Sequence, residues 1–368
     1  MVLIHRVSAP CSVKDLIPFF QPIVRLRDGE VVGFEALARL PVGSQLHAPF
    51  EALAAAGVES LFLLFRSILA QTVRFALSLG QARKDVFFTI NVDARVATRP
   101  DFLDHLGRNG ALASLAPHRL VSEILEGEDL ANSAELSTAM DGLRRIGISV
   151  ALDDIGSAYA SLANIKNLPA DVLKLDRVFA LGLGNRPHDL QFIWSMLGLA
   201  RGLGKKLIVE GVETADVYDA LSILGVEYVP GFFIARPMAS SQVAKWIAAY
   251  RPRCASRTPK SLMGVYASHL MLVETCRVLN QQPLPLNWDE TASDPHSCKI
   301  GRFFDQSNLH DTRYGRAHMC FHRVLARYGD APVEWEAAAE AFRRALALAI
   351  SEGFDRPAEL RVAASKLM

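Results

Sequence analysis

The amino-acid sequence predicts an α/β fold, an irregular (β/α)8, TIM-like barrel with one antiparallel strand, followed by a small all-α helical bundle. From residue 21 to about 240, roughly eight short apolar segments alternate with helical patterns, which favours a parallel sheet closed into a barrel. The Asp28–Gly29 pair between the first two segments indicates a hairpin, so one strand should run antiparallel. Beyond residue 260 only helical patterns follow, as in a bundle.

Each predicted strand is a short apolar run bounded by turn residues. Helical patterns separate the later strands, for example at residues 132–146, 187–203 and 213–225. We expect the strands at residues 21–26, 31–40, 86–93, 120–126, 148–155, 172–176, 207–212 and 228–235.

The segment 251–260 divides the sequence. It contains four basic residues, two prolines and no acidic residue, which is typical of a linker. We therefore expect a barrel domain at residues 1–250, a basic linker at 251–260 and a helical domain at 261–368, with helices near 261–281, 311–328 and 332–351.

Composition limits the classes of function. A net charge of +1 over 368 residues gives no argument for a nucleic-acid partner or for broad membrane attraction. The five scattered cysteines indicate reduced thiols. The apolar stretch 61–80 contains Arg66 and Arg74 and is too polar for a membrane span, and residues 1–10 lack the apolar core of a signal peptide. We expect a cytoplasmic protein.

Polar side chains lie near the C-terminal end of nearly every predicted strand, and these ends meet at one mouth of a parallel barrel. A lone Asp or Glu there is usually a helix cap or a surface ion-pair partner. Asp153 and Asp154 are adjacent, so both can face the mouth only if the strand stops there. The coincidence over several strands predicts a shared site, and its oxygen ligands favour Mg²⁺, Mn²⁺ or Ca²⁺ over zinc. The candidates are Glu35, Asn91, Glu123, Glu126, Asp153, Asp154, Lys174 and Glu210.

Several motifs occur in a fixed order: "QPIV", "FEALARL", "TINVD", "SEILE", "DDIGSAYASL", "VLKLD" and "VEGVET". Over roughly residues 15–248 they resemble the EAL domain, the cyclic di-GMP phosphodiesterase family. The resemblance implies a barrel with one antiparallel strand, which is often a homodimer. It also implies two divalent metals, Mg²⁺ or Mn²⁺, and hydrolysis of cyclic di-GMP to linear pGpG.

The resemblance implies a role for each matching residue. Lys174 would polarise the attacking water, and Glu210 or Asp154 would accept its proton. Glu126 would brace the loop after Asp154. Contacts to the substrate would come from Gln21, to the nucleotide, and Arg39, to a phosphate. The metal ligands would be Glu35, Asn91, Glu123, Asp153 and Glu210, with Asp154 as a bridging or second-metal ligand.

The sequence departs from the family pattern at one position and in one short segment. Pro230 stands where a glutamine is usual, and residues 155–158 read Ile-Gly-Ser-Ala where Phe-Gly-Thr-Gly is usual. Ala158 lacks the backbone freedom of glycine. These departures favour an alternative function, a catalytically weak or inactive cyclic di-GMP receptor that signals through contact with a partner protein. The complete set of charged ligands favours the enzyme.

Five of the ten histidines follow residue 260. His318 and His322 are four residues apart and therefore share a helix face, whereas Cys320 faces away. With His269 and Cys298 they would form a set suited to a closed tetrahedral zinc site. From spacing alone, ordinary core or surface histidines are the alternative.

Residues 262–328 also resemble the chemoreceptor zinc-binding (CZB) domain, through "SHLMLV", "SDPHSCKIGRFF" and "AHMCFH". Phe303 stands where a tryptophan is usual. The resemblance implies that Zn²⁺ is bound by His269, Cys298, His318 and His322. Together the two resemblances predict metal-dependent hydrolysis of cyclic di-GMP, regulated by a C-terminal zinc-binding sensor domain.

Overall fold

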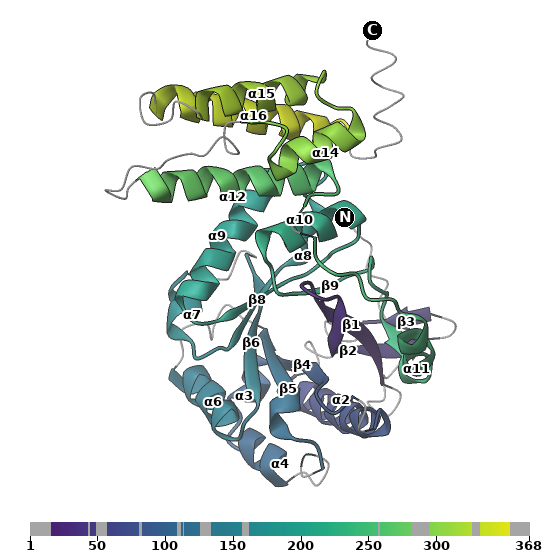
Figure 1. Cartoon of the computed structure of the whole chain (residues 1–368). Helices are drawn as coiled ribbons and strands as arrows, with labels where there is room; N and C mark the ends of the chain where they lie inside the picture. Colours follow the sequence, from purple (N-terminus) through teal and green to yellow (C-terminus); the bar gives the residue numbers. More distant parts are fainter. Residues whose placement is uncertain are drawn as a thin grey trace.

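A closed barrel forms the larger part of the molecule (Figure 1). The computed structural model describes residues 16–42, 45–48, 57–80, 83–108, 112, 114–125, 134–156, 162–256, 258–280, 294–325 and 332–353. Within them, the barrel strands are β1 (Ile17–Arg25), β2 (Glu30–Val42), β4 (Phe87–Asp93), β5 (Leu120–Leu125), β6 (Ser149–Ile155), β7 (Val172–Leu175), β8 (Lys206–Val209) and β9 (Tyr228–Pro230).

The strand directions confirm the predicted barrel. β1 pairs antiparallel with both β2 and β9, which closes the sheet. The remaining neighbours, from β2 through β9, pair in parallel. Two short strands, β3 (Gln45–His47) and β10 (Met238–Ala239), extend the sheet antiparallel to β2 and β1.

Helices surround the barrel (Figure 1). Thr214 caps α10 (Ala215–Leu224), because its side chain accepts a hydrogen bond from the Val217 amide. Asp93 and Asp176 cap α3 and α8 in the same way. The helices are α2 (Val58–Ser78), α3 (Ala94–Ala97), α4 (Phe102–Arg108), α6 (Ala134–Arg145), α7 (Leu162–Asn167), α8 (Arg177–Leu181), α9 (Asp189–Gly202), α10 (Ala215–Leu224) and α11 (Ser240–Ala249), with a short 3-10 turn at Pro117–Arg119.

Helix α2 is the one helix of the described residues that is long and apolar enough to cross a membrane. Half of its most apolar window is buried inside the molecule. Its Phe75 stacks on Phe20 of β1 and meets Phe88 of β4 edge to face. These contacts place α2 against the barrel core, which agrees with the expectation that this stretch is not a membrane span.

The strand predicted at 228–235 is wrong in its second half. β9 ends at Pro230, and the Gly231 carbonyl then accepts hydrogen bonds from the amides of Ile234 and Ala235. The chain therefore turns directly after the proline, where a continuous apolar run suggested an extended strand.

The C-terminal helices are α12 (Leu262–Asn280), α14 (Lys299–Ser307), α15 (Arg313–Leu325) and α16 (Pro332–Ser351), as the predicted bundle requires. The sequence reading missed α14, although Ile300, Phe303 and Phe304 are buried at helical spacing. Figure 1 shows α12 lying across α10 of the barrel. Apolar residues of these helices continue the barrel's own core, so the two parts share buried surface.

The chain between α11 and α12 lies against the barrel. The Tyr218 hydroxyl donates to the Arg253 carbonyl at 2.8 Å, and the Ala255 amide donates to the Leu26 carbonyl at 3.1 Å. Buried Asp219 of α10 accepts from the Lys260 amide (2.8 Å), the Ser261 amide (3.0 Å) and the Ser261 hydroxyl (2.9 Å). Asp219 thus satisfies amide groups at the start of α12 from the neighbouring helix.

Candidate active site and Cys/His cluster

An apolar layer inside the barrel forms the floor of the site. Val121, Ala151, Val172 and Ile208 are buried there, one from each of four consecutive parallel strands. Side chains alternate along a strand, so the residue two positions later points to the same interior. Those residues are Glu123, Asp153, Lys174 and Glu210. The alternation therefore directs three carboxylates and one ammonium to one level above the apolar floor.

Lys174 is the centre of the site. Its side chain is 1% exposed, which excludes a surface lysine. Its Nζ lies 3.0 Å from Glu123, 3.1 Å from Asp153 and 2.6 Å from Glu210. Glu35 of β2 approaches the same nitrogen at 3.5 Å. Four strands thus bring a carboxylate within 3.5 Å of one ammonium group.

The charges of these groups are strongly coupled. Burial alone lowers the pKa of Lys174, but the four carboxylates raise it well above its usual value, so the lysine stays charged. Burial and repulsion from Glu35 and Asp153 raise the pKa of Glu210 to about 8. Burial also raises the pKa of Glu123 well above its usual value, because its effect exceeds that of Lys174, whose positive charge lowers this pKa.

The donor set fits divalent cations. Four carboxyl groups surround a single ammonium in a mostly buried site, so their full ionisation requires further positive charge. Oxygen Oε1 of Glu123 is buried, has no hydrogen-bond partner among the residues that the structure describes and is not the atom that pairs with Lys174. Such an oxygen is costly to bury without a cation. Carboxylate oxygens are the ligands that Mg²⁺ and Mn²⁺ prefer.

Asp153 and Asp154 face different surroundings because β6 contains an irregularity. The strand does not stop at the pair, as we expected, but continues to Ile155 with a register shift between Leu152 and Ile155. Asp154 adopts a left-handed φ of 55°, and its amide donates to the Asp153 carboxylate at 3.0 Å. The irregularity leaves Asp153 buried beside Lys174 and Asp154 exposed at the mouth.

Asp176 is a site residue that the sequence reading missed, although it closes the motif "VLKLD". Partial desolvation at the mouth and repulsion from Asp153 and Asp176 raise the pKa of Asp154 to about 6. Asp176 also caps α8 through the Val178 amide at 2.7 Å. The sequence did not single it out as a site residue, because an aspartate directly before a helix is already explained as a helix cap.

The remaining candidates surround these carboxylates. Asn91 of β4 pairs in register with Glu123, and Gln21 of β1 pairs in register with Glu35. Gln21 donates to the Ala235 carbonyl at 3.3 Å. Arg39 lies four residues after Glu35 on the same face of β2 and is half-buried. Two expectations, Glu126 and the loop at 157–161, lie outside the described residues.

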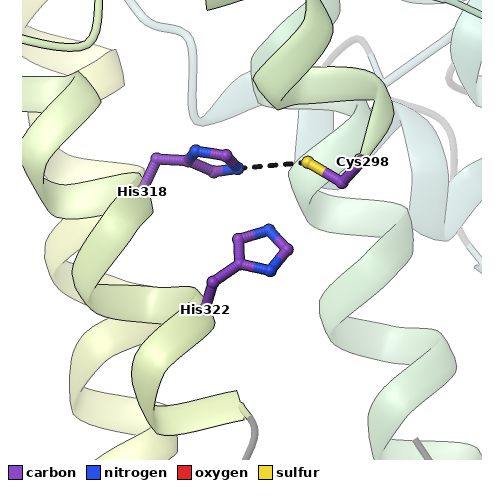
Figure 2. Close-up of side chains that lie close together, drawn as sticks. All are labelled: Cys298, His318 and His322. Atoms are coloured by element: carbon purple, nitrogen blue, oxygen red, sulfur yellow. Dashed lines mark hydrogen bonds between the residues drawn. The ribbon is translucent and has the colours of Figure 1, made fainter. Parts of the chain in front are cut away.

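Three predicted zinc ligands meet among the C-terminal helices (Figure 2). Ligand atoms of Cys298, His318 and His322 all lie within 4.8 Å of one another. The Cys298 sulfur is 3.3 Å from Nε2 of His318 and caps α14 by accepting from the Gly301 amide at 3.1 Å. Cys320 is exposed, as expected. The cluster therefore offers one sulfur and two imidazoles in a nearly closed interior.

Burial sets the protonation of this cluster. Burial, with repulsion from His322 and His269, lowers the pKa of His318 to about 2, so its imidazole is neutral. Burial raises the pKa of Cys298. Cys298 lies at the N-terminal end of α14, and the helix dipole there would stabilise its thiolate once a cation is near. Neutral imidazoles and a thiolate are zinc ligands.

The fourth predicted ligand, His269, is not brought into the cluster. Its Nε2 lies 2.9 Å from the Ala339 carbonyl, while its Nδ1 is buried with no hydrogen-bond partner in the described part of the chain. Rings of Phe321 and Phe342 contact its imidazole. The side chain is thus fixed beside the cluster, with one nitrogen still free to bind a cation.

Comparison with known proteins identifies the barrel. The family model described as the EAL domain matches residues 5–237. The matched residues end before the C-terminal helices, whose likeness to the CZB domain stays a prediction. A solved structure described as the PaMucR phosphodiesterase in complex with c-di-GMP has a TM-score of 0.56 and 29% identity, covering 62% of this chain and 94% of that one.

Two curated relatives come from Pseudomonas aeruginosa. The bifunctional diguanylate cyclase/cyclic di-GMP phosphodiesterase MucR is 29% identical over 250 residues, 67% of this chain and 36% of that protein. The cyclic di-GMP phosphodiesterase NbdA is 30% identical over 235 residues, 63% of this chain and 30% of that protein. The chain thus spans about a third of the length of the curated relatives it matches.

Proposed function

The chain belongs to the EAL domain family, and we propose that it hydrolyses cyclic di-GMP to linear pGpG with two Mg²⁺ or Mn²⁺ ions. One observation carries the proposal: four strands each bring a carboxylate to Lys174 at the barrel mouth. Named relatives are cyclic di-GMP phosphodiesterases, and a similar solved structure holds c-di-GMP. These similarities support the choice of substrate.

Bound metal ions would provide an activated water and positive charge next to the phosphate and the leaving oxygen. Their ligands in this chain would be Glu35, Asn91, Glu123, Asp153 and Glu210, with Asp154 as a bridging or second-metal ligand. The carboxyl groups gathered around Lys174, and Oε1 of Glu123, which has no partner among the described residues, support this donor set.

Hydrolysis forms a bond between the water oxygen and one phosphorus and breaks the bond from that phosphorus to the ribose 3′ oxygen. Lys174, fixed among the carboxylates, would donate to the attacking water and stabilise it as hydroxide. Asp154 or Glu210 would take the proton that this water loses, and the leaving 3′ oxygen would gain a proton from solvent. Asp154 is exposed at the mouth and can exchange its proton with solvent, whereas Glu210 pairs with Lys174 at 2.6 Å.

Substrate contacts would come from the rim of the barrel. Arg39 shares a face of β2 with Glu35, which suits a contact to a phosphate next to the metal ligands. Gln21 lies directly opposite Glu35 on β1, which suits a contact to the nucleotide. Pro230 of β9 pairs with Ile23, two residues from Gln21, and offers no polar side chain there.

The test is an assay of the purified chain with cyclic di-GMP and Mg²⁺ or Mn²⁺, with pGpG measured by chromatography. The matched control is Glu35→Gln, which keeps the size of the side chain and removes its charge. We expect pGpG from the wild-type protein only. Tight binding of cyclic di-GMP without pGpG would support the receptor alternative instead, and absence of binding would contradict both.

The Cys/His cluster would bind Zn²⁺ and regulate the barrel as a C-terminal sensor domain. His269 would complete the site through Nδ1, because its Nε2 can donate to the Ala339 carbonyl, an arrangement typical of metal-bound histidines. The proposal divides the chain into a barrel at 1–250, the segment 251–260 and helices at 261–368. The contacts of Asp219 with Ser261 join the two parts and support an effect of zinc on the barrel.

Zinc regulation has its own test. Metal content should be near one tightly bound zinc per chain and should be lost in a His318→Ala/His322→Ala variant. Turnover and assembly state are then compared with and without a zinc chelator at fixed excess Mg²⁺. If turnover and assembly do not change with the chelator, the zinc has a structural role only and regulation is excluded.

The expected homodimer, the signalling partner and the cytoplasmic location belong to the same proposal. Size-exclusion chromatography with light scattering tests the dimer.

A further inference from the structure

A second group of metal-binding side chains lies at the surface of the C-terminal helices. His296 precedes α14, Asp305 is in its last turn, and His310 follows it. Nδ1 of His296 lies 2.9 Å and Nε2 of His310 lies 2.6 Å from the same oxygen, Oδ1 of Asp305. We propose that these three residues form a solvent-accessible Zn²⁺ site, separate from the Cys/His cluster, with one coordination position open.

The backbone fixes the positions of both histidines. A side chain at Gly301 would collide with the Pro295 carbonyl and crowd the Cα of His296, so the turn that carries His296 lies directly against α14. Asp305 is four residues after Gly301 and therefore on the same face of α14. The turn and the helix thus bring His296 to Asp305 without depending on attraction between their side chains.

The turn that carries His310 is fixed in the same way. A side chain at Gly315 would collide with the carbonyls of Leu309 and His310, so this turn lies against the start of α15. Asn308 ends α14 with a left-handed φ of 54°, which reverses the chain there. The three ligands therefore come from two turns and one helix that close backbone packing holds together.

The donor set and its spacing suit zinc. Two imidazoles and one carboxylate are typical of zinc sites that keep a water or substrate in the fourth position. With bonds of about 2.0–2.2 Å in a tetrahedron, ligand atoms lie roughly 3.3 Å apart. The present separations of 2.9 and 2.6 Å would open by less than about 1 Å. Side-chain exposures of 51, 44 and 23% for His296, Asp305 and His310 leave the site open to solvent.

The ring of Phe304 lies between this site and the buried cluster. Its centroid is 6.0 Å from the ring of His310 and 5.3 Å from that of His318. The two sites therefore share an aromatic wall but no ligand. The buried cluster offers a cysteine sulfur, which becomes a thiolate when zinc binds, and should hold zinc more tightly, whereas the surface site should exchange zinc readily.

The experiment counts zinc bound to the full-length protein by equilibrium dialysis against buffered free Zn²⁺, with excess Mg²⁺ present for the barrel carboxylates. We expect wild-type protein to bind one more zinc than a His296→Ala/His310→Ala variant. Asp305→Asn, which keeps the size of the side chain, should lower the affinity for that extra zinc by more than about tenfold. Loss of a residue that only supports a metal ligand already lowers affinity about tenfold, and loss of the ligand itself should lower it further. His118→Ala, at an exposed histidine of the barrel, is the matched control.

Cys298→Ser separates the two sites, because it removes the thiolate and keeps an oxygen to cap α14. This variant should lose the tight zinc and retain the weaker one. The proposal is overturned if the variants at 296, 305 and 310 bind as much zinc as wild type, since the three side chains then form only a hydrogen-bonded group. It is equally overturned if Cys298→Ser loses both zinc ions.

Discussion

Replacement of Lys174 by methionine tests the electrostatics of the barrel site most directly. Methionine keeps the length of the aliphatic chain and removes the ammonium that four carboxylates contact at 2.6–3.5 Å. Without it, four carboxyl groups share a mostly buried site with no ammonium to balance their charge. Removal of one partner from a buried ion pair costs about 3–5 kcal/mol, because the other charge is left uncompensated.

This cost converts into a change of melting temperature. An unfolding entropy of about 2.1 cal/mol/K per residue gives roughly 0.8 kcal/mol/K for a chain of this length. A loss of about 3–5 kcal/mol should therefore lower the melting temperature by about 4–6 °C in the presence of a metal chelator. Turnover should fall by at least about a hundredfold, since the attacking water loses its cationic neighbour.

Metal ions should reverse part of this loss. At a concentration a hundred times its dissociation constant, a bound ion stabilises the folded state by about 2.7 kcal/mol. The lysine-free site is more negative and should bind Mg²⁺ about tenfold more tightly, which adds about 1.4 kcal/mol. Mg²⁺ should thus raise the melting temperature of Lys174→Met by about 2 °C more than that of wild type.

Differential scanning calorimetry with and without Mg²⁺ measures these shifts. Lys205→Met is the matched control, because Lys205 donates to the Leu168 and Ala170 carbonyls at 2.9 and 2.8 Å and touches no carboxylate of the site. Its variant should lose stability equally with and without Mg²⁺. A Mg²⁺ shift in Lys174→Met no larger than that in wild type would refute the reasoning.

Three further predictions address the catalytic ligand, the junction and the departure from the family pattern. Glu35→Gln should reduce turnover by at least about a hundredfold while the melting temperature in chelator stays near that of wild type or rises, because like charge is removed; unchanged turnover in the folded variant would exclude Glu35 as a ligand. Asp219→Ala should cost about 1–3 kcal/mol by leaving the donors of Lys260 and Ser261 unpaired, whereas Asp219→Asn, which keeps an acceptor, should recover most of it in thermal melts. Pro230→Gln should raise kcat if a missing polar group limits the rate, and an unchanged kcat would make this position part of the scaffold only.

The sequence predicted the strands and interior carboxylates because alternation along a strand is a local property. Val121 and Glu123, or Val172 and Lys174, are two residues apart and must face the same interior. The direction of each strand followed from helix-length connections and one hairpin. These predictions needed no knowledge of how distant segments approach one another.

Features that depend on local backbone irregularity were not predictable in this way. The irregularity at Asp154 places two adjacent aspartates in different environments, and no residue type in "ALDDI" signals it. The turn after Pro230 follows from hydrogen bonds to the Gly231 carbonyl. In both cases an apolar run was compatible with a straight strand, and the departure appears only in the folded chain.

In the C-terminal helices, contacts between residues far apart in the sequence could not be predicted either. His318 and His322 could be paired from helical spacing, whereas the hydrogen bond that holds His269 to the Ala339 carbonyl joins residues 70 positions apart. His296 and His310 could not be linked to Asp305 from the sequence. Their approach depends on Gly301 and Gly315, which have no side chain and let the neighbouring turns pack against the helices. Glycine signals close packing in a sequence, but not what approaches it.

The arrangement of consecutive elements explains why a metal site in the helices would affect the barrel. Glu210 follows β8, and the chain then forms α10, which carries Asp219 and lies under α12. His269, whose Nδ1 is available to a metal, is part of α12. A shift of α12 on zinc binding would therefore act on a helix that begins five residues after Glu210, a proposed metal ligand. Asp219 fixes the start of α12 to that helix, so its removal should weaken the effect of zinc on turnover while both metal sites remain intact.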